Sequence, residues 1–534
     1  MLFAALLLLC AGCKQAKMDV SGKYVLDEQR NEAIINDAGS VTKLVDGNAR
    51  VYYQIFVGSF SDSNGDGIGD LQGIINRFDY LNDGNPNSGV SLGIEGIWLS
   101  PIFVSPTYHK YDTNDYYQVD PKFGTEADLK ALIDLCHERG VQIILDLVIN
   151  HTSTKHAWFQ QFITAHKNYD TTNQYYYYYS WSNEPVAGKT WNPIPGVNGE
   201  YYECNFSGDM PELDFSNEAV RQEMVNVAKY YLDLGVDGFR FDAAKYIYYG
   251  AGEENTDFWD WYMAQLRAIK PNIYSVAEVW DGDGVTFPYF SSTNCFNFSM
   301  AQDNGVISQT AKGGDVNYFV SYIENYLNTI KAERNDAMLC AFIANHDMDR
   351  AAGFLNVSSG NAKMAANLSI LTPGSPFIYY GEEIGLKGSR GGSNTDANRR
   401  LAMLWGDEDT VKDPAGANYS SGQTNGSVKD QLPDGDSLYN HYKKLIMIRK
   451  ANPEIAYGTF RALKTDTKAS GFVSTYEGSS VAVLHNPTKN AVTIDLSKVT
   501  NIPFDAITAF VGAGTATLDG TLLTIDAQTS VILR

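Results

Sequence analysis

Three acidic residues, Asp242, Glu278 and Asp347, each stand at the end of an apolar run of the kind that forms a buried strand. The runs are Gly238–Phe241, Ser275–Ala277 and Ala337–Ile343. Two carboxyl groups that meet at one site can cleave a glycosidic bond, because one attacks as an ionised nucleophile while the other donates a proton. The three acids therefore predict glycoside hydrolysis, provided that the fold brings them together.

The neighbours of two of these acids suit different protonation states. Side chains at positions i and i+2 of a strand point the same way, so we expect Arg240 to hold Asp242 as a carboxylate. Trp280 stands two residues after Glu278 and offers an apolar neighbour, which favours a protonated carboxyl near neutral pH. The pattern thus suits Asp242 to the ionised state and Glu278 to the protonated state.

Strand–helix–glycine–strand units recur along the chain and supply a scaffold for these strand ends. The helical pattern Glu126–Arg139 leads through Gly140 into the strand Val141–Leu147, and Glu218–Leu234 leads through Gly235 toward Asp242. The strands are almost continuously apolar, which is typical of a parallel sheet buried on both faces. Seven or eight such units over ~390 residues predict an α/β fold, a (β/α)8 TIM barrel, whose catalytic groups lie at the carboxyl ends of the strands.

Two segments depart from the barrel pattern. The connection over residues 151–215 is long, shows little helical pattern and is rich in Tyr, Asn, Gly and Pro, which predicts a subdomain inserted after strand three. Short alternating runs separated by turn residues predict a C-terminal antiparallel β-sandwich domain over 454–534. We therefore expect the barrel over 50–150 and 216–453, preceded by a tether and an irregular segment over 14–49.

Residues 1–13 have the features of an export signal. The apolar run Leu2–Leu9 is too short to cross a bilayer, and Ala11-Gly12-Cys13 is similar to a bacterial lipobox, whose cysteine is lipidated. Cys10 stands where that motif has Leu, and no basic residue precedes the run. We expect an exported protein that is lipid-anchored to the bacterial cell envelope through Cys13, or a secreted one; a fortuitous apolar start is the remaining alternative.

The composition excludes several classes of protein. With 44% hydrophobic and 13% aromatic residues over 534 positions, the chain is neither disordered nor collagen-like. Its formal net charge of −22 repels polyanions, so we expect no nucleic-acid partner. Four cysteines follow the leader without a zinc-binding spacing, and both free thiols and disulfides stay open for Cys136, Cys204, Cys295 and Cys340. A monomer is expected.

A glycine-rich loop offers oxygen ligands for a cation. Asp62, Asn64, Asp66 and Asp70 stand at every second or fourth position, between Ser, Gly and Ile. Calcium takes six to eight oxygen ligands, and neighbouring carboxylates repel one another unless a cation lies between them. The spacing is similar to the opening of an EF-hand loop, but Gly73 stands where that loop ends in Glu. We predict a calcium site here, with an Asn/Gly turn as the alternative.

Four strand-end segments resemble the signature regions of the α-amylase family, glycoside hydrolase family 13. They are DLVINH (Asp146–His151), GFRFDAAKY (Gly238–Tyr246), VAEVW (Val276–Trp280) and FIANHD (Phe342–Asp347). Three accessory segments agree, namely Gly93–Pro101, Met210–Asp214 and Gly374–Glu383. The similarity extends in order and spacing from about Ala49 to Arg534, and the lipobox makes the chain most similar to the bacterial lipoprotein-type members.

The resemblance implies a retaining mechanism. Asp242 would form the glycosyl ester, Glu278 would protonate the leaving oxygen and then activate water, and Asp347 would stabilise the oxocarbenium-like transition state. It also implies sugar contacts by a set of polar residues: Tyr111, Asp112, His151, Arg240, Lys245, His346 and Arg400.

The resemblance further implies Ca2+ as a cofactor at two places. In the first, the ligands would be Asp62, Asn64, Asp66, Asp70 and the carbonyl oxygen of Ile68. The second would lie between barrel and insertion, with Asn150, Glu212 and the carbonyl oxygen of Tyr246 as ligands. Glu212 stands there where the family usually has Asp.

The expected substrate is a neutral α-glucan. The aromatic residues of the insertion, Tyr175–Tyr179, Trp181 and Trp191, offer flat faces for pyranose rings. In the resembling family, Ala after the nucleophile accompanies α-1,4 specificity, and Ala243 holds that position. We therefore expect retaining endo-hydrolysis of α-1,4 bonds in starch, glycogen or maltooligosaccharides. The alternatives are a maltogenic amylase or cyclomaltodextrinase, an α-glucosidase or oligo-1,6-glucosidase, an α-glucanotransferase, and a non-catalytic starch-binding lipoprotein, which would have lost the three acids.

Overall fold

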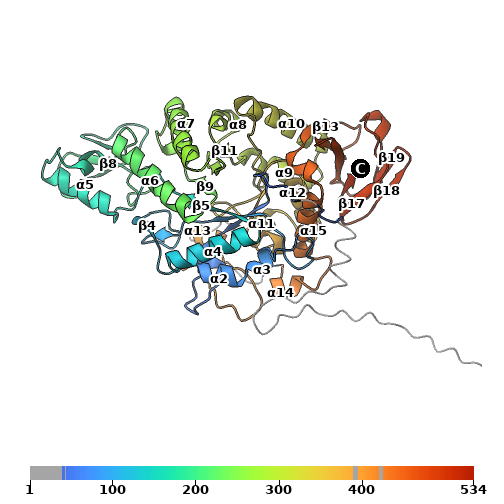
Figure 1. Ribbon diagram of the computed structural model, residues 1–534, viewed down its shortest axis with the longest axis horizontal. Coiled ribbons are helices and arrows are strands. Elements are labelled where there is room, and N and C mark those ends of the chain that lie inside the picture. The colour runs from blue at the N-terminus through green and yellow to red at the C-terminus, as the bar shows by residue number, and fades with distance from the viewer. Residues whose placement is uncertain (1–38, 43, 389–394, 420–424) are drawn as a thin grey trace, which may run out of the picture.

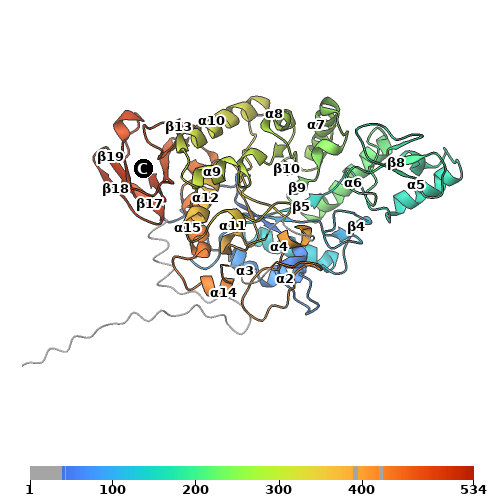
Figure 2. The ribbon, with the colours of Figure 1, turned by 180° about the vertical axis from the view of Figure 1, so that it is seen from behind.

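A barrel forms the middle of the molecule, with the insertion at one end and the C-terminal strands at the other (Figures 1 and 2). The computed structural model describes residues 39–42, 44–388, 395–419 and 425–534. The predicted leader, with Cys13, and most of the predicted tether lie outside the described residues. Within the described ranges, no helix combines the length and apolar character that a membrane crossing requires.

Eight parallel strand positions close the barrel, as the sequence predicts. Seven of them form one sheet in the order β11-β10-β9-β5-β2-β1-β12. Their bounds are β1 (Tyr52–Ile55), β2 (Gly96–Leu99), β5 (Gln142–Leu147), β9 (Gly238–Phe241), β10 (Tyr274–Ala277), β11 (Asn294–Cys295) and β12 (Phe377–Tyr379). Parallel bridges from Phe296 to Cys340 and from Phe342 to Phe377 place the segment 340–342 between β11 and β12. That segment is the remaining strand position and joins the two edges of the sheet.

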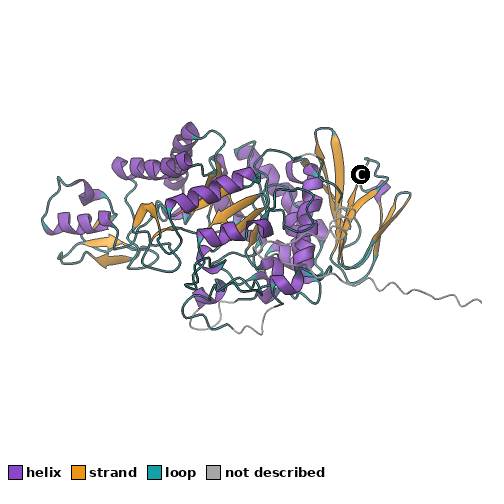
Figure 3. Ribbon diagram, turned by 60° about the horizontal axis from the view of Figure 1, so that its bottom comes forward, coloured by secondary structure: helices purple, strands orange, loops and turns teal. Residues whose placement is uncertain are grey.

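Helices surround this sheet on its outside (Figure 3). They are α2 (Leu71–Asn76), α3 (Phe78–Leu81), α4 (Glu126–Glu138), α6 (Glu218–Leu234), α7 (Gly252–Ile269), α8 (Asp283–Thr286), α9 (Val306–Ala311), α10 (Val316–Glu333), α11 (Ala351–Phe354), α12 (Asn361–Ile370), α13 (Thr395–Arg399), α14 (Val428–Gln431) and α15 (Leu438–Ala451). The two predicted helices are present. Thr125 caps α4 in a capping box, and Gly235 ends α6 with a φ of 120° that L-residues rarely adopt.

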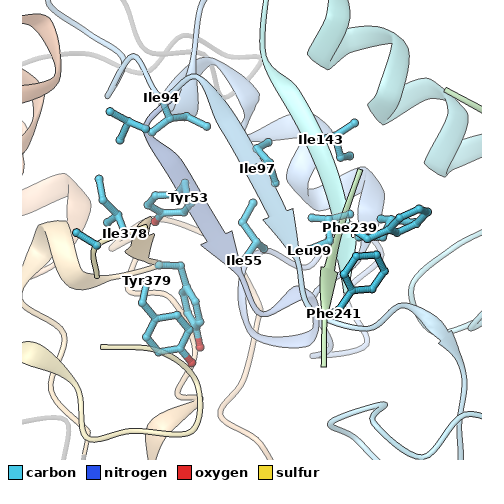
Figure 4. Close-up of a cluster of buried hydrophobic side chains, with 14 of the residues drawn as sticks. Tyr53, Ile55, Ile94, Ile97, Leu99, Ile143, Phe239, Phe241, Ile378 and Tyr379 are labelled. Carbon is cyan, nitrogen blue, oxygen red and sulfur yellow. The ribbon is translucent and has the colours of Figure 1, made fainter. Parts of the chain in front are cut away.

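The strands separate two apolar cores because successive side chains point to opposite faces. Outward residues such as Ile55, Leu99 and Phe239 pack between the sheet and the helices (Figure 4). Inward residues such as Trp98 and Phe377 belong to a separate cluster inside the barrel. Polar side chains occupy the inward positions that follow toward the carboxyl ends, and these positions form the site.

The insertion contains a helix that the sequence analysis did not predict. Helix α5 (Ala157–Lys167) packs near a small sheet of order β6-β8-β7, formed by β6 (Trp181–Ser182), β7 (Trp191–Pro193) and β8 (Tyr201–Glu203). The expectation of little helix in this segment is therefore wrong. Its apolar stripe is aromatic, with Phe159 buried against the rings of Tyr179 and Tyr202 at centroid distances of 5.0 Å each. Tertiary packing thus outweighs the modest helix propensity of these residues.

A two-residue strand β3 (Phe103–Val104) pairs with β4 (Asp115–Val119) beside the barrel. The segment between these strands carries Tyr111 and Asp112 into the region above the strand ends.

The C-terminal domain is the predicted antiparallel sandwich. After α16 (Pro453–Tyr457), one sheet has the order β13-β14-β15-β20-β17 and the other the order β16-β19-β18. The strands are β13 (Thr459–Leu463), β14 (Ser470–Tyr476), β15 (Ser479–Asn486), β16 (Val492–Asp495), β17 (Ile507–Gly512), β18 (Ala516–Asp519), β19 (Leu522–Ile525) and β20 (Thr529–Leu533). Buried residues of both sheets, including Leu484 and Ile525, form a shared core.

The four cysteines of the described chain, Cys136, Cys204, Cys295 and Cys340, are buried free thiols. The sequence left both free thiols and disulfides open, and the structure contains the free thiols.

Gly238 is required where β9 pairs with β10. A Cβ atom there would lie 1.8 Å from the carbonyl oxygen of Tyr274 on the paired strand, so Gly238→Ala must displace the backbone. We expect a loss of at least ~3 kcal/mol in the free energy of unfolding, measured as a lower thermal midpoint. The control Gly284→Ala meets no atom within 4 Å and should leave the midpoint close to wild type. Equal midpoints for the two variants would contradict this account of the strand pairing.

Candidate active site

A cavity of about 460 Å³ opens at the carboxyl ends of the barrel strands. It collects eight of the residues that the sequence analysis associates with the site: Tyr111, His151, Asp242, Lys245, Tyr246, Glu278, Asp347 and Arg400. The three predicted catalytic acids, which are far apart in the chain, are all among them. The first requirement of a two-carboxylate mechanism is therefore met.

Strand register explains why these acids meet. Asp146 on β5 is the direct partner of Arg240 on β9, and Arg240 is the partner of Val276 on β10. Inward side chains recur at every second residue, so Asp242 follows Arg240, and Glu278 follows Val276, on the same face. The amide of Glu278 continues the ladder by donating to the carbonyl of Phe241 at 2.9 Å.

Arg240 joins three carboxylates beneath the cavity. Its Nη1 lies 2.7 Å from Asp146 Oδ1 and 2.6 Å from Asp242 Oδ1, while its Nη2 lies 2.9 Å from Glu278 Oε2. The Arg240 side chain is fully buried, and those of Asp242 and Glu278 are each 10% exposed. One guanidinium thus orients both predicted reacting groups.

A second arginine holds the third acid. Arg400 Nη2 lies 2.7 Å from Asp347 Oδ1, and His346 Nε2 lies 3.0 Å from Asp347 Oδ2. His346 Nδ1 is in turn 2.7 Å from Gln54 Nε2 on β1. Both oxygens of Asp347 are therefore fixed by buried partners.

Burial sets different protonation states for the three acids. It raises the pKa of Glu278 to about 7, against the attraction of Arg240 and with the repulsion of Asp242 and Asp347 added. It raises the pKa of Asp242 to about 6, again against Arg240. For Asp347, contacts with His346 and Arg400 outweigh burial and hold the pKa well below its ordinary value. Between about pH 6 and about pH 7, Glu278 therefore keeps its proton while Asp242 and Asp347 are ionised.

Two details of the sequence argument need correction. Arg240 does contact Asp242, but burial outweighs this contact and raises the pKa of Asp242 to about 6, so the expected carboxylate forms only above that pH. Trp280 lies at the rim, 40% exposed and stacked on Phe298 at a centroid distance of 5.1 Å. The elevated pKa of Glu278 comes first from the burial of the whole pocket floor and then from its charged neighbours.

Tyr111, His151 and Lys245 lie around the cavity. The hydroxyl of Tyr111 donates to Asp146 Oδ2 at 2.9 Å, and its ring stacks on His346 at 5.2 Å. His151 Nε2 is 3.1 Å from the carbonyl of Tyr111, and burial lowers the pKa of this histidine to about 4, so it is neutral. Lys245 donates to the carbonyl of Trp280 at 2.9 Å.

Three residues predicted to contact sugar do not line the cavity. Asp112 is buried and accepts hydrogen bonds from the hydroxyls of Ser105, at 2.7 Å, and Thr107. Its carboxylate therefore stabilises its own loop. Arg240 and His346 are fully buried below the cavity floor, where they hold the acids that do line it.

The aromatic residues of the insertion mostly form its own core. Tyr176, Tyr178 and Tyr179 are buried, and neither Trp181 nor Trp191 lines the cavity. The insertion contributes instead Phe206, Ser207 and Met210. The ring of Phe206 lies 5.3 Å from that of His151.

Further residues of the site had no predicted role: His109, Phe206, Ser207, Met210, Asp396 and Arg399 in the lining, and Gln54, Trp98 and Asp146 beneath it. Ala243 and Trp280, which the sequence analysis singled out, also line the cavity. Asp146 lies near the end of the predicted strand Val141–Leu147, which was a usable signal. The others come from loops or from β1 and β2, where spacing along the chain carries no information about the cavity. Ala243 has a left-handed φ of 46°, which turns the chain directly after Asp242.

The predicted calcium ligands are all oxygen donors, which suits calcium, but their own loop occupies them. Asp62 Oδ1 and Oδ2 accept the amides of Gly65, at 2.8 Å, and Gly67, at 2.7 Å. Asp66 Oδ1 accepts the amide of Ile68 at 2.8 Å. Asp70 Oδ1 caps α2 by accepting from Gly73. Among the described residues, no three His, Cys, Asp or Glu side chains are grouped to hold a metal, and calcium binding at this loop stays a prediction.

The residues of the predicted second calcium site are closer to a fit. Asn150 Nδ2 donates to Glu212 Oε2 at 3.1 Å, and the buried Asn150 Oδ1 has no hydrogen-bond partner among the described residues. Burial raises the pKa of Glu212 to about 8, which favours its neutral form. Calcium ligands must be deprotonated, so binding here would require Glu212 to ionise, and the second calcium site stays a prediction.

Comparisons with known proteins agree on one family. The model of the alpha amylase catalytic domain matches residues 54–458. Alpha-amylase 3 of Dictyoglomus thermophilum is 34% identical over 440 residues, covering 82% of this chain and 84% of that protein. The 4-alpha-glucanotransferase of Thermotoga maritima is 30% identical, covering 81% of this chain and 95% of that protein. Among solved structures, Eubacterium rectale Amy13B superimposes with a TM-score of 0.85 at 33% identity, covering 97% of this chain and 99% of that one.

Replacing Arg240 tests its place at the centre of the site. In Arg240→Leu, three buried carboxyls lose their shared counter-charge, so their folded-state pKa values rise further above the unfolded values. Stability is then lost as the pH rises through those folded-state values. We expect a loss of about 3–5 kcal/mol at pH 7.5 and a smaller loss at pH 5, measured by urea unfolding at both pH values. Exposed Arg461→Leu is the control, and a loss for Arg240→Leu that does not depend on pH would contradict the shared counter-charge.

Proposed function

This chain belongs to the α-amylase family of glycoside hydrolases, and from that premise we propose that it is a retaining α-amylase, which cleaves internal α-1,4 bonds of starch, glycogen or maltooligosaccharides. The observation that carries the proposal is the shared contact of Asp242 and Glu278 with one buried guanidinium at the floor of the cavity. It supports a nucleophile and an acid that act on one bond, as a double displacement requires.

The reaction would proceed in two steps. Asp242, ionised above pH 6, attacks the anomeric carbon while Glu278 protonates the departing glycosidic oxygen, so that the bond breaks and a glycosyl ester forms. Glu278, now ionised, takes a proton from water as that water attacks the ester, which releases the sugar with its original anomeric configuration. Both groups thereby return to their starting protonation states.

Asp347 and its partners would stabilise the charge that develops on the sugar. Its pKa is held well below the ordinary value, so it stays anionic throughout the working range. An anion fixed by Arg400 and His346 needs no reorganisation when positive charge develops at the anomeric centre. Tyr111 lines the same wall and offers its ring to the sugar.

Ala243 supports α-1,4 rather than α-1,6 specificity, through the family pattern noted above. Its left-handed φ of 46° is tolerated better by Ala than by a β-branched residue, so the backbone itself favours a small side chain after the nucleophile.

Glycosyl transfer is the second candidate function. Phe206, Met210 and Trp280 give the cavity an apolar side next to Lys245, where a sugar acceptor could exclude water from the ester. The similarity to a 4-alpha-glucanotransferase at 30% identity agrees with that reading. Transfer uses the same three acids, so only the products distinguish it from hydrolysis.

We also propose calcium binding at the loop 62–70 and export with lipid attachment at Cys13. The calcium proposal is supported by the oxygen donors of Asp62, Asn64, Asp66 and Asp70, and binding would require the loop to exchange its own hydrogen bonds for the ion. The export proposal is supported by residues 1–13 of the sequence alone.

Product analysis tests the proposed activity. Incubation with soluble starch should lower viscosity rapidly and yield maltooligosaccharides that NMR shows first as α-anomers, while isomaltose should be cleaved slowly. Glu278→Gln should lower kcat on starch by roughly 10²–10⁴-fold because the proton donor is lost. The exposed Glu218→Gln serves as control. Efficient cleavage of isomaltose without thinning of starch would favour an oligo-1,6-glucosidase. Products that are longer than the substrate would favour glycosyl transfer. Full activity of Glu278→Gln would overturn the mechanism.

Metal removal tests the calcium proposal. The thermal midpoint should rise by several degrees when 1 mM CaCl2 replaces EDTA, because calcium binding to the folded state adds ~2–4 kcal/mol to the free energy of unfolding. Asp66→Ala should abolish this difference, whereas Asp466→Ala, at another exposed position, should retain it. A calcium-dependent midpoint that survives Asp66→Ala would move the ion to another site.

A further inference from the structure

Asp146 is a buried carboxyl that the proposed mechanism does not use. It is fully buried and does not line the cavity. It accepts hydrogen bonds from Trp98 Nε1 at 3.2 Å, from the hydroxyl of Tyr111 at 2.9 Å and from Arg240 Nη1 at 2.7 Å. A carboxylate that binds three donors and does not contact substrate can influence the reaction only through those donors.

The connection to the reacting groups is direct. A single nitrogen, Arg240 Nη1, serves both Asp146 and Asp242, and the neighbouring Nη2 serves Glu278. Both contacts of the Glu278 carboxyl fall on Oε2, the second being the amide of Ala243 at 3.2 Å. One positive charge thus faces three acids at the floor of the cavity.

We propose that Asp146 is a positioning residue that keeps Glu278 protonated: as an anion it takes up part of the charge of Arg240, which would otherwise stabilise ionised Glu278. The inference rests on the proposed function for its assignment of Glu278 as the acid. It adds a role for a residue that touches neither the substrate nor Glu278.

The charges around the site support this role. Asp146 and Asp242 as anions already face the single charge of Arg240, so this cluster carries one excess negative charge before Glu278 ionises. A further negative charge in a buried space is unfavourable. Without Asp146, the count becomes neutral and ionisation of Glu278 meets less resistance. Burial raises the pKa of Asp146 to about 6, so it is an anion in the range where Glu278 must still hold its proton.

Other charged or titratable groups face Glu278 or line the same cavity. They are Arg240 and Asp242 from β9, Asp146 from β5, His346 and Asp347 after the segment 340–342, Tyr246 after β9, and, elsewhere in the lining, His109, Tyr111, His151, Lys245, Asp396, Arg399 and Arg400. Burial lowers the pKa of His346 and raises the pKa of Tyr246. Asp242 and Asp347 are needed for the reaction itself, so Asp146 is the acid whose charge can be removed without removing a reacting group.

Neutral variants of Asp146 test the proposal through the pH profile of kcat/KM. The basic limb lies near pH 7 in the wild type and should move down by about one pH unit in Asp146→Asn. The acid limb should also move down, because the Arg240 charge that Asp146 no longer takes up stabilises ionised Asp242 as well as ionised Glu278. Asp146→Ser, a smaller neutral variant, should shift the limbs in the same direction. Asp146→Glu keeps the charge and should keep the basic limb near its wild-type position.

The matched control is Asp112→Asn. It removes another buried carboxylate beside the site, one that bonds Ser105 and Thr107 and does not contact Arg240. Its basic limb should stay within ~0.3 pH units of wild type. Lower activity of Asp146→Asn and Asp146→Ser with unshifted limbs would show a merely structural role and overturn the proposal, as would an equal shift in Asp146→Glu.

A second readout does not depend on catalysis. The infrared carbonyl band of protonated Glu278 is the band that Glu278→Gln lacks, and its loss with rising pH gives the protonation midpoint in the resting protein. That midpoint should fall in Asp146→Asn and Asp146→Ser and stay in Asp146→Glu. If the wild type cleaves no α-glucan, the proposed function fails, but this titration still decides between an effect of Asp146 on Glu278 and none.

Discussion

The site depends on one buried positive charge that faces three carboxylates. Isolated, the Arg240 guanidinium would be very costly to bury, and so would each of its acidic partners. Together they compensate one another, and the geometry that allows this compensation also points Asp242 and Glu278 at the same volume of the cavity. The requirement to satisfy a buried charge and the requirement to align two reacting groups are thus met by the same contacts.

The barrel makes this arrangement possible because its strands alternate. Inward positions near the middle of the strands carry Tyr52, Trp98, Phe296 and Phe377, which fill the interior with apolar and aromatic groups. The next inward positions toward the carboxyl ends carry the ionised groups. The apolar plug below excludes water from the floor of the site, and this exclusion raises the pKa values of Asp242 and Glu278 despite the nearby arginine.

Much of the fold follows from local patterns. The apolar runs and the glycine-terminated helices Glu126–Glu138 and Glu218–Leu234 predict the barrel, because strand and helix periods are properties of short segments. Helix α5 was missed because its stripe is aromatic and is stabilised by rings from distant residues. The two-residue strand β11 was missed because it is shorter than any pattern that periodicity can resolve.

The sequence by itself determined the barrel class, the C-terminal sandwich and the three acids at the strand ends, since each depends on residue order within a segment. Only the tertiary structure decided which predicted sugar-contact residues reach the cavity: Tyr111 does, whereas Asp112 bonds its own loop and Arg240 lies beneath the floor. It also decided the protonation states, because burial and charge act through space between residues that the chain order separates. The shared guanidinium and the role inferred for Asp146 are consequences of strand register and closure.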